Sequence, residues 1–118
     1  MSSDTVRYAL FSEVFAALAH PKRLEMIHYL GEGQKSAGEI AELTKLSKAN
    51  VSQHLSVLKA RGLVHCDKCG TFCHYRLTSP KVLETCEIVR ELILDQMQTT
   101  SQLQEALSTV VPLRKGEK

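Results

Sequence analysis

Apolar residues recur along this chain at the three- and four-residue spacing that places them on one face of a helix. The spacing predicts helices over residues 5–19, 21–30, 36–42 and 47–61, and a long helix that begins at residue 80. After Gly62 the period becomes that of strands, which predicts a β-hairpin over residues 63–67 and 72–77. The residues expected to face inward from the first four helices are Leu10, Val14, Leu18, Leu24, Ile27, Leu30, Ile40, Leu43, Val51, Leu55 and Leu58.

The residues at the segment boundaries support the same division. Pro21 suits the first turn of a helix, and Gly33 suits the exit from one. Ser36 and Glu39 have the spacing of a capping box, and Ser47 is a good N-cap for the helix that follows. Two helices joined by a short turn and followed at once by a hairpin form a winged helix-turn-helix. The expected fold class is therefore mainly α with a small β-hairpin.

The long last helix carries an apolar stripe that a domain of this size cannot bury on its own. A second copy of the chain is the natural cover for such a stripe, so we expect a homodimer. We predict that residues 1–98 form one DNA-binding and dimerisation domain, and that residues 99–118 form a helical extension with a frayed tail. The stripe consists of Val82, Cys86, Ile88, Val89, Leu92, Ile93 and Met97.

The length of 118 residues and the apolar content of 43% are those of one globular domain. The net charge is only +2, but residues 44–76 hold six lysines and arginines against one aspartate, so this segment carries +5 and the remainder −3. Such a local concentration is typical of a DNA-contacting surface. No apolar run approaches the roughly 18–20 residues of a membrane span, and the first residues lack a signal pattern. We therefore expect a cytoplasmic protein.

Four stretches carry a family resemblance: "FAALAHPKRLEMIHYL", "SAGEIAEL", "LSKANVSQHLSVLKARGLV" and "YRLTSP". Over residues 11–80 the chain resembles the ArsR/SmtB family of bacterial winged-helix repressors. The resemblance implies a homodimer, joined through the first and last helices, that binds an operator and releases it when an inducer binds. It also implies a metal or metalloid inducer. Two common ligand sites of that family are missing here, since the short helix before the turn holds no cysteine and the last helix no histidine.

The resemblance and helical geometry both place residues 47–61 in the major groove of DNA. The outward residues near the start of this helix are Lys48, Ala49, Ser52 and Gln53. Gln53 can pair with adenine, Ser52 can donate or accept, and Ala49 can touch a thymine methyl group. Phosphate contacts are predicted for Asn50, Ser56 and Lys59 on the helix and for Lys68, Thr71 and Arg76 on the hairpin.

The hairpin sequence "HCDKCGTFCH", residues 65–74, concentrates the candidate inducer ligands. A turn centred on Cys69 and Gly70 would set Cys66 opposite Cys73, close enough to share one ion or to form a disulfide. Cys69, at the tip, could fold over as a third thiolate. Three sulfurs suit As(III), whereas Zn(II) or Cd(II) would recruit a histidine as a fourth ligand. An ion bound by these cysteines is expected to deform the wing and weaken operator binding.

The same cysteines allow other interpretations. A repressor of this fold could sense thiol oxidation or reactive sulfur instead of a metal. A zinc-binding adaptor that never reads DNA is a third class, and the basic helix-turn-helix counts against it. A thiol-disulfide oxidoreductase would need a βαβ context that is missing, so we expect no enzymatic activity. Cys86 is interpreted as a small apolar residue, and His54 as a packing or hydrogen-bonding residue.

Overall fold

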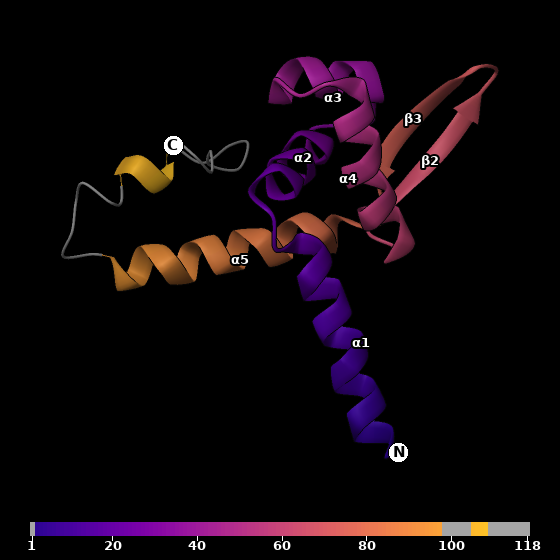
Figure 1. Cartoon of the computed structure of the whole chain (residues 1–118). Coiled ribbons are helices and arrows are strands. Elements are labelled where there is room, and N and C mark those ends of the chain that lie inside the picture. The colour runs from indigo at the N-terminus through magenta and orange to yellow at the C-terminus, as the bar shows by residue number, and fades with distance from the viewer. Residues whose placement is uncertain (1, 98–104, 109–118) are drawn as a thin grey trace.

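The computed structural model describes residues 2–97 and 105–108, which form a winged helix-turn-helix (Figure 1). The predicted mainly helical fold with a β-hairpin is confirmed, and residues 105–108 are also helical. The elements in chain order are α1 (Ser3–Leu18), α2 (Pro21–Gly31), β1 (Lys35–Ser36), α3 (Ala37–Thr44), α4 (Lys48–Ala60), β2 (Val64–Cys69), β3 (Phe72–Leu77) and α5 (Pro80–Gln96).

The helices α2, α3 and α4 surround one hydrophobic core, to which the base of the hairpin and the start of α5 also contribute. The predicted inward row of α4, Val51, Leu55 and Leu58, lies in this core. Because that row is buried, the opposite side of α4 is left on the surface. The buried apolar residues are Ala17, Leu18, Met26, Ile27, Leu30, Ile40, Val51, Leu55, Leu58, Leu63, Val64 and Val82.

Three of the residues predicted to face inward lie on the surface instead. Leu10, Leu24 and Leu43 are 56%, 41% and 42% exposed. The first turns of α1 extend away from the body of the domain, so Leu10 has no neighbouring element to pack on (Figure 1). In α2 the buried face is rotated to include Met26, and at the end of α3 the core position is taken by Thr44.

The N-terminus of α3 has the predicted capping box. The Ser36 hydroxyl accepts a hydrogen bond from the Glu39 backbone N–H at 3.1 Å, and the Ser36 N–H donates to the Glu39 carboxylate at 2.8 Å. The hydrogen bond from the Ser36 backbone, more than any other contact, lowers the pKa of Glu39. The first helix of the helix-turn-helix is therefore anchored at its start.

Replacing Ser36 with Ala is expected to destabilise the domain modestly. An alanine cannot accept the bond from the Glu39 N–H, and loss of such a cap costs about 1 kcal/mol. For a domain of this size the melting temperature should fall by about 4–8 °C in a thermal unfolding experiment. Ser12→Ala is the control, since Ser12 lies inside exposed α1 and bonds only to the Ala9 carbonyl. Equal stability of the two variants would contradict the capping role.

The hairpin belongs to a three-stranded antiparallel sheet of order β1-β3-β2. The two-residue strand β1 was not predicted; Lys35 pairs with Tyr75, and Ser36 with His74. It holds the loop between α2 and α3 against the base of the wing. A strand of two residues has no detectable alternation in the sequence, so its pattern does not predict it.

The predicted register of the hairpin was wrong. The turn lies at Gly70 and Thr71, not at Cys69 and Gly70, so Cys69 pairs with Phe72 and Cys66 pairs with Tyr75 instead of Cys73. Gly70 has φ of +66°, which a glycine adopts without steric cost, and the turn begins there. A turn displaced by one residue changes every partner by two residues. Because strand alternation has a period of two, the same side chains still share a face.

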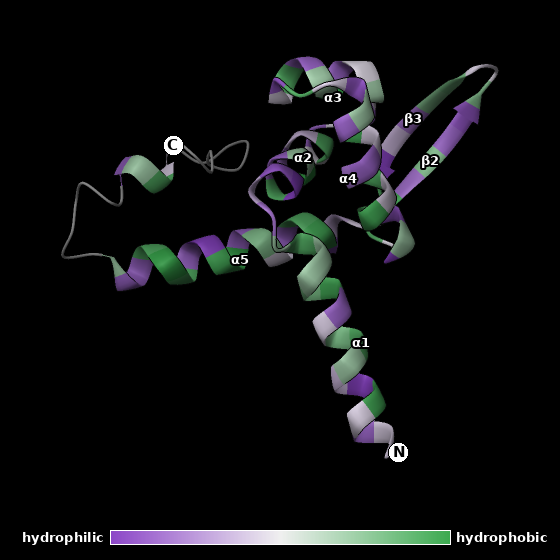
Figure 2. Cartoon of the chain, viewed as in Figure 1, coloured by the Kyte–Doolittle hydropathy of each residue, from purple (hydrophilic) through white to green (hydrophobic). Residues whose placement is uncertain are grey.

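Apolar side chains remain exposed along α1 and along α5 beyond its first turns. The hydropathy colouring shows hydrophobic residues along both helices (Figure 2). On α5, Val82 is buried and Cys86 half-buried against the core, whereas Ile88, Val89 and Leu92 are 64%, 47% and 55% exposed. The large apolar residues exposed on α1 are Val6, Tyr8, Leu10, Phe11 and Phe15. The stripe predicted for the last helix is thus only partly covered within one chain.

The predicted domain boundary at residue 98 lies outside the described residues. Of the predicted C-terminal extension, the structure describes residues 105–108 only. Across residues 2–97 and 105–108, no helix combines the length and the apolar character needed to cross a bilayer.

Candidate nucleic-acid interface

The outer face of α4 presents every helix residue predicted to contact DNA. Ser47 caps the helix by accepting a hydrogen bond from the Asn50 N–H at 3.1 Å. The turn before it passes through Lys45, which has a left-handed φ of 62°. All seven predicted residues of the helix are exposed: Lys48, Ala49, Asn50, Ser52, Gln53, Ser56 and Lys59. The helix thus displays a small, polar and basic surface of the kind that enters a major groove.

Arg23, for which no sequence pattern predicts a role, connects α4 to the preceding helices. Its guanidinium donates to the Ala17 carbonyl at the end of α1 and to His54 Nδ1 on α4 at 3.2 Å. Because an arginine only donates, His54 Nδ1 must be the acceptor and its ring neutral. The His20 ring lies 4.5 Å from the His54 ring, centroid to centroid. The predicted packing and hydrogen-bonding role of His54 is confirmed.

Acidification is expected to weaken this junction. Burial, followed by the nearby His20 and Arg23, lowers the pKa of His54 below its usual value of 6.5. The unfolded chain therefore takes up a proton at higher pH than the folded chain, so stability falls as the pH drops below about 6.5 and through the folded pKa. Urea unfolding of wild type and His54→Gln at about pH 7.5 and about pH 5.5 measures this, because the variant lacks the titrating ring. An equal pH dependence of stability in wild type and His54→Gln would contradict this expectation.

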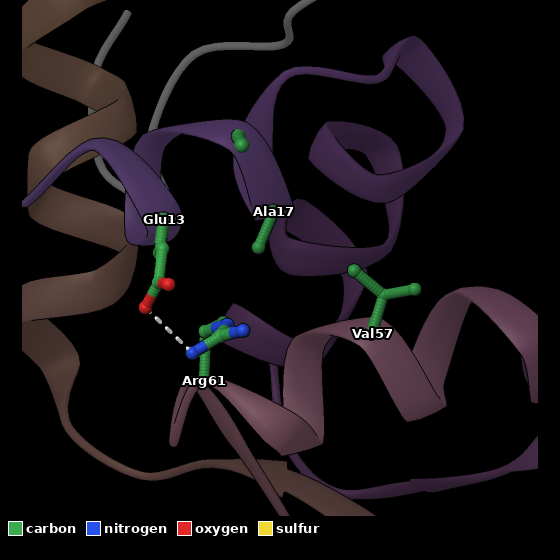
Figure 3. Close-up of a pocket in the computed structure, with 5 residues that line it drawn as sticks. Glu13, Ala17, Val57 and Arg61 are labelled. Atoms are coloured by element: carbon green, nitrogen blue, oxygen red, sulfur yellow. Dashed lines mark hydrogen bonds and ion pairs between the residues drawn. The ribbon is translucent and has the colours of Figure 1, made fainter. Parts of the chain in front are cut away.

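A second connection joins α1 to the C-terminal end of α4. Glu13 and Arg61 form an ion pair with 2.8 Å between the carboxylate oxygen and the guanidinium nitrogen. The pair lies at the edge of a shallow pocket of about 250 Å³ that Ala16, Ala17 and Val57 also line (Figure 3). The middle and the C-terminal end of α4 are thus attached to the helical framework, which holds its outer face in a defined direction.

The wing places its predicted DNA contacts on different faces. Lys68 pairs with Cys73 in the ladder, while Arg76 pairs with His65, and alternation sets these two pairs on opposite faces of the hairpin. Thr71 is exposed in the turn between them. The Arg76 guanidinium lies 2.8 Å from the Asp67 carboxylate, and His65 Nε2 lies 3.0 Å from the same group. All three residues are exposed, and Arg76 is already ion-paired.

The three cysteines of the wing are not brought together. Cys66 and Cys73 form a disulfide with their Cα atoms 5.9 Å apart, and both are half-buried. Cys69 is a free, exposed thiol on the opposite face of β2. In the described part of the chain, no group of three or more histidines, cysteines, aspartates and glutamates has metal-binding geometry. The three-thiolate arrangement predicted for As(III) is therefore not assembled, because strand alternation separates Cys69 from the other two.

The fourth cysteine, Cys86, packs against the core from α5. Burial raises the pKa of its thiol, and the neighbouring Glu87 raises it further. A raised pKa keeps the sulfur protonated and unreactive. This environment agrees with the prediction that Cys86 acts as a small apolar residue.

Residues 20–65, which span the helix-turn-helix, match the family model described as "Bacterial regulatory protein, arsR family". The regulator Rv0081 of Mycobacterium tuberculosis is 32% identical over 87 residues, which cover 73% of this chain and 76% of Rv0081. This chain belongs to the arsR family. The predicted resemblance is confirmed, and the members of this family are regulators of transcription rather than enzymes.

Three further proteins or structures are similar to this chain. The probable mercury resistance operon repressor of Streptomyces lividans is 32% identical over 69% of this chain and 65% of its own length. The solution structure of Mb0332 from Mycobacterium bovis, a homodimeric winged helix-turn-helix DNA-binding domain, has a TM-score of 0.72 at 26% identity, covering 81% of this chain and 88% of that one. The crystal structure of Rv0081 also gives 0.72, at 30% identity, covering 78% and 93%.

Proposed function

We propose that this protein is a repressor that binds an operator with α4 in the major groove and the wing along the phosphate backbone. The observation that carries the proposal is the exposed outer face of α4, opposite a fully buried row on the same helix. Gln53, Ser52 and Ala49 are the base-reading residues, since they lie near the N-terminal half of the helix. The phosphate contacts come from Lys48, Asn50, Ser56 and Lys59, with Lys68, Thr71 and Arg76 from the wing.

The repressor acts as a homodimer in this proposal. The exposed apolar residues of α1 and α5 form the interface, as the similar Mb0332 domain is homodimeric. Two recognition helices then read two half-sites, so the operator should be close to palindromic. Residues 1–98 supply both surfaces, and residues 99–118 are an extension beyond them.

A salt-titrated binding assay with the DNA upstream of the protein's own gene tests the proposal. We expect specific binding whose affinity falls steeply with salt concentration, because each phosphate contact releases counterions. A shuffled DNA of the same composition is the control, and it should bind more weakly by roughly three or more orders of magnitude. Equal affinity for both DNAs would instead favour the non-DNA adaptor.

For the inducer, we propose a thiophilic metal or metalloid ion bound by thiolates of the wing. The support is chemical: Cys66 and Cys73 share one strand face, and soft thiolates select soft ions. The similar Streptomyces lividans protein is named for mercury resistance. Since Cys69 lies on the other face, reduced Cys66 and Cys73 are the core of this site, and As(III), Zn(II) or Cd(II) would need further ligands.

Two variants separate the two-thiolate site from the three-thiolate site. With reduced protein, Cys73→Ser should abolish operator release by As(III), Zn(II) or Cd(II), because one of the paired thiolates is lost. Cys69→Ser should still release the operator if the facing pair is sufficient. Loss of the response in both variants would instead support the three-thiolate site. The measurement is fluorescence anisotropy of a labelled operator during ion titration.

A further inference from the structure

The wing contains a pair of cysteines that the fold has brought into bonding contact. Cys66 on β2 and Cys73 on β3 are diagonal neighbours on one face, since their ladder partners are Tyr75 and Lys68. Their Cα atoms are 5.9 Å apart, within the range of about 4.4–6.8 Å that disulfides require. Both residues are half-buried rather than enclosed, so small molecules can reach the sulfurs. Two cysteines at this separation and with this exposure can form and break a disulfide reversibly.

The nearest charged neighbour across the ladder favours reaction at Cys73. Lys68 lies directly opposite Cys73 on the same face, where paired Cβ atoms are about 4.5–5.5 Å apart. A lysine ammonium stabilises a nearby thiolate relative to the thiol, and the thiolate is the reactive form. Cys69, on the other face, is placed neither to share this effect nor to join the pair.

We propose that Cys66 and Cys73 form a reversible redox switch that is closed by hydroperoxides, and that closing it releases the operator. The second part rests on the proposed operator-binding function; the first part does not. The switch and the ion site use the same two sulfurs. They exclude one another, because a disulfide has no thiolate left to bind an ion.

Oxidation of the two thiols to a disulfide needs a hydroperoxide as the oxidant and no bound cofactor. The Cys73 thiolate attacks one oxygen of the hydroperoxide, the O–O bond breaks, and a sulfenic acid and an alcohol are formed after the alkoxide takes up a proton. The Cys66 thiolate then attacks the sulfenic sulfur, the S–S bond forms, and hydroxide leaves and is protonated to water. Overall, two thiols lose two electrons and two protons to the hydroperoxide, which becomes an alcohol and water. A cellular thiol reverses the reaction by exchange.

The position of the pair connects this chemistry to DNA. Residues 67–72, which lie between the two cysteines, form the end of the wing and include Lys68 and Thr71. A bond between diagonal neighbours closes this end into a covalent loop, whereas the reduced wing is held by non-covalent contacts, which are the ladder hydrogen bonds and the ion pairs of Asp67. The reduced wing can therefore adjust to the phosphate backbone, and the closed wing cannot.

The first experiment reads the bond itself, without DNA. Chelator-treated, fully reduced protein is exposed to hydrogen peroxide, alkylated and analysed by mass spectrometry. Of the four cysteines, Cys69 and Cys86 should remain free and Cys66 and Cys73 should be linked. Cys69→Ser should oxidise like wild type, and Lys68→Gln should oxidise more slowly. A disulfide that includes Cys69, or oxidation only by a small organic disulfide and not by peroxide, would overturn the assignment.

The second experiment measures operator affinity of the reduced and the peroxide-oxidised protein with chelator present. We expect the oxidised form to bind at least about fivefold more weakly, the lower end of usual coupling strengths, and thiol treatment to restore binding. Cys66→Ser should show no difference between the two conditions, and Cys69→Ser should show the wild-type difference. Equal affinity of oxidised and reduced wild type would refute the switch while leaving the repressor intact. If the reduced protein bound no operator, the proposed repressor function would be refuted. The mass spectrometry experiment would still show whether Cys66 and Cys73 form a disulfide.

Discussion

Replacing Leu92 with Glu is expected to convert the protein from a dimer to a monomer and to lower operator affinity by about a hundredfold or more. Leu92 is 55% exposed on α5, beside Ile88 and Val89, so its side chain is not needed to fold the single chain. A glutamate in an apolar interface would leave an unpaired carboxylate away from water in each subunit, which is costly. Loss of the dimer separates the two recognition helices, and the gain from binding two half-sites at once disappears.

Sedimentation velocity measures the oligomeric state of this variant, circular dichroism its helix content, and the operator assay its affinity. Gln34→Glu is a matched control, because it adds the same charge at an exposed loop position that is not among the exposed apolar residues of α1 and α5. The control should remain dimeric and bind like wild type. If the Leu92→Glu protein stayed dimeric at micromolar concentration, the assignment of the dimer interface to α5 would be wrong.

Gln53→Ala should weaken operator binding roughly 5- to 150-fold, since a good bidentate contact to one base pair is worth about 1–3 kcal/mol of discrimination. The side chain is exposed on the outer face of α4, so its removal leaves the core intact. The loss should be confined to DNA with the cognate base pair. Binding to shuffled DNA should hardly change, so the specificity ratio falls with the affinity.

Lys48→Ala is the informative comparison for this prediction. Lys48 is also exposed at the start of α4, but an ammonium group near phosphate acts on every DNA sequence. Its loss should weaken operator and shuffled DNA alike and reduce the slope of log affinity against log salt by about one. If Gln53→Ala also weakened shuffled DNA equally, or if neither variant differed from wild type, α4 would not be the recognition helix as assigned.

The order of helices and the hairpin could be predicted because each has a local signature. The buried row Val51, Leu55 and Leu58 repeats at helical spacing, and the Ser36–Glu39 capping box needs only three residues of separation. Which apolar residues of α2 are buried could be predicted less accurately. Leu24 and Met26 are both apolar, and only the direction of the neighbouring helices decides that Met26 is enclosed.

The junction of Arg23 with His54 illustrates a second kind of limit. The two residues are 31 positions apart, and no spacing pattern in the sequence predicts that they are in contact. The resemblance to the arsR family included the segment that contains Arg23, but the segment alone does not tell which carbonyls and rings the guanidinium meets. A contact between residues this far apart in the sequence depends on how α1, α2 and α4 cross.

Helical periodicity, helix caps and a family signature are encoded locally, so a winged helix-turn-helix of the arsR family with a basic segment can be predicted from the residues alone. The arrangement of the wing cysteines depends on tertiary pairing. A turn one residue later than expected changed every cross-strand partner by two, which kept Cys66 and Cys73 on one face and set Cys69 on the other. Register depends on the backbone conformation at Gly70 and on the pairing of whole strands, and the spacing of cysteines along the chain does not specify either.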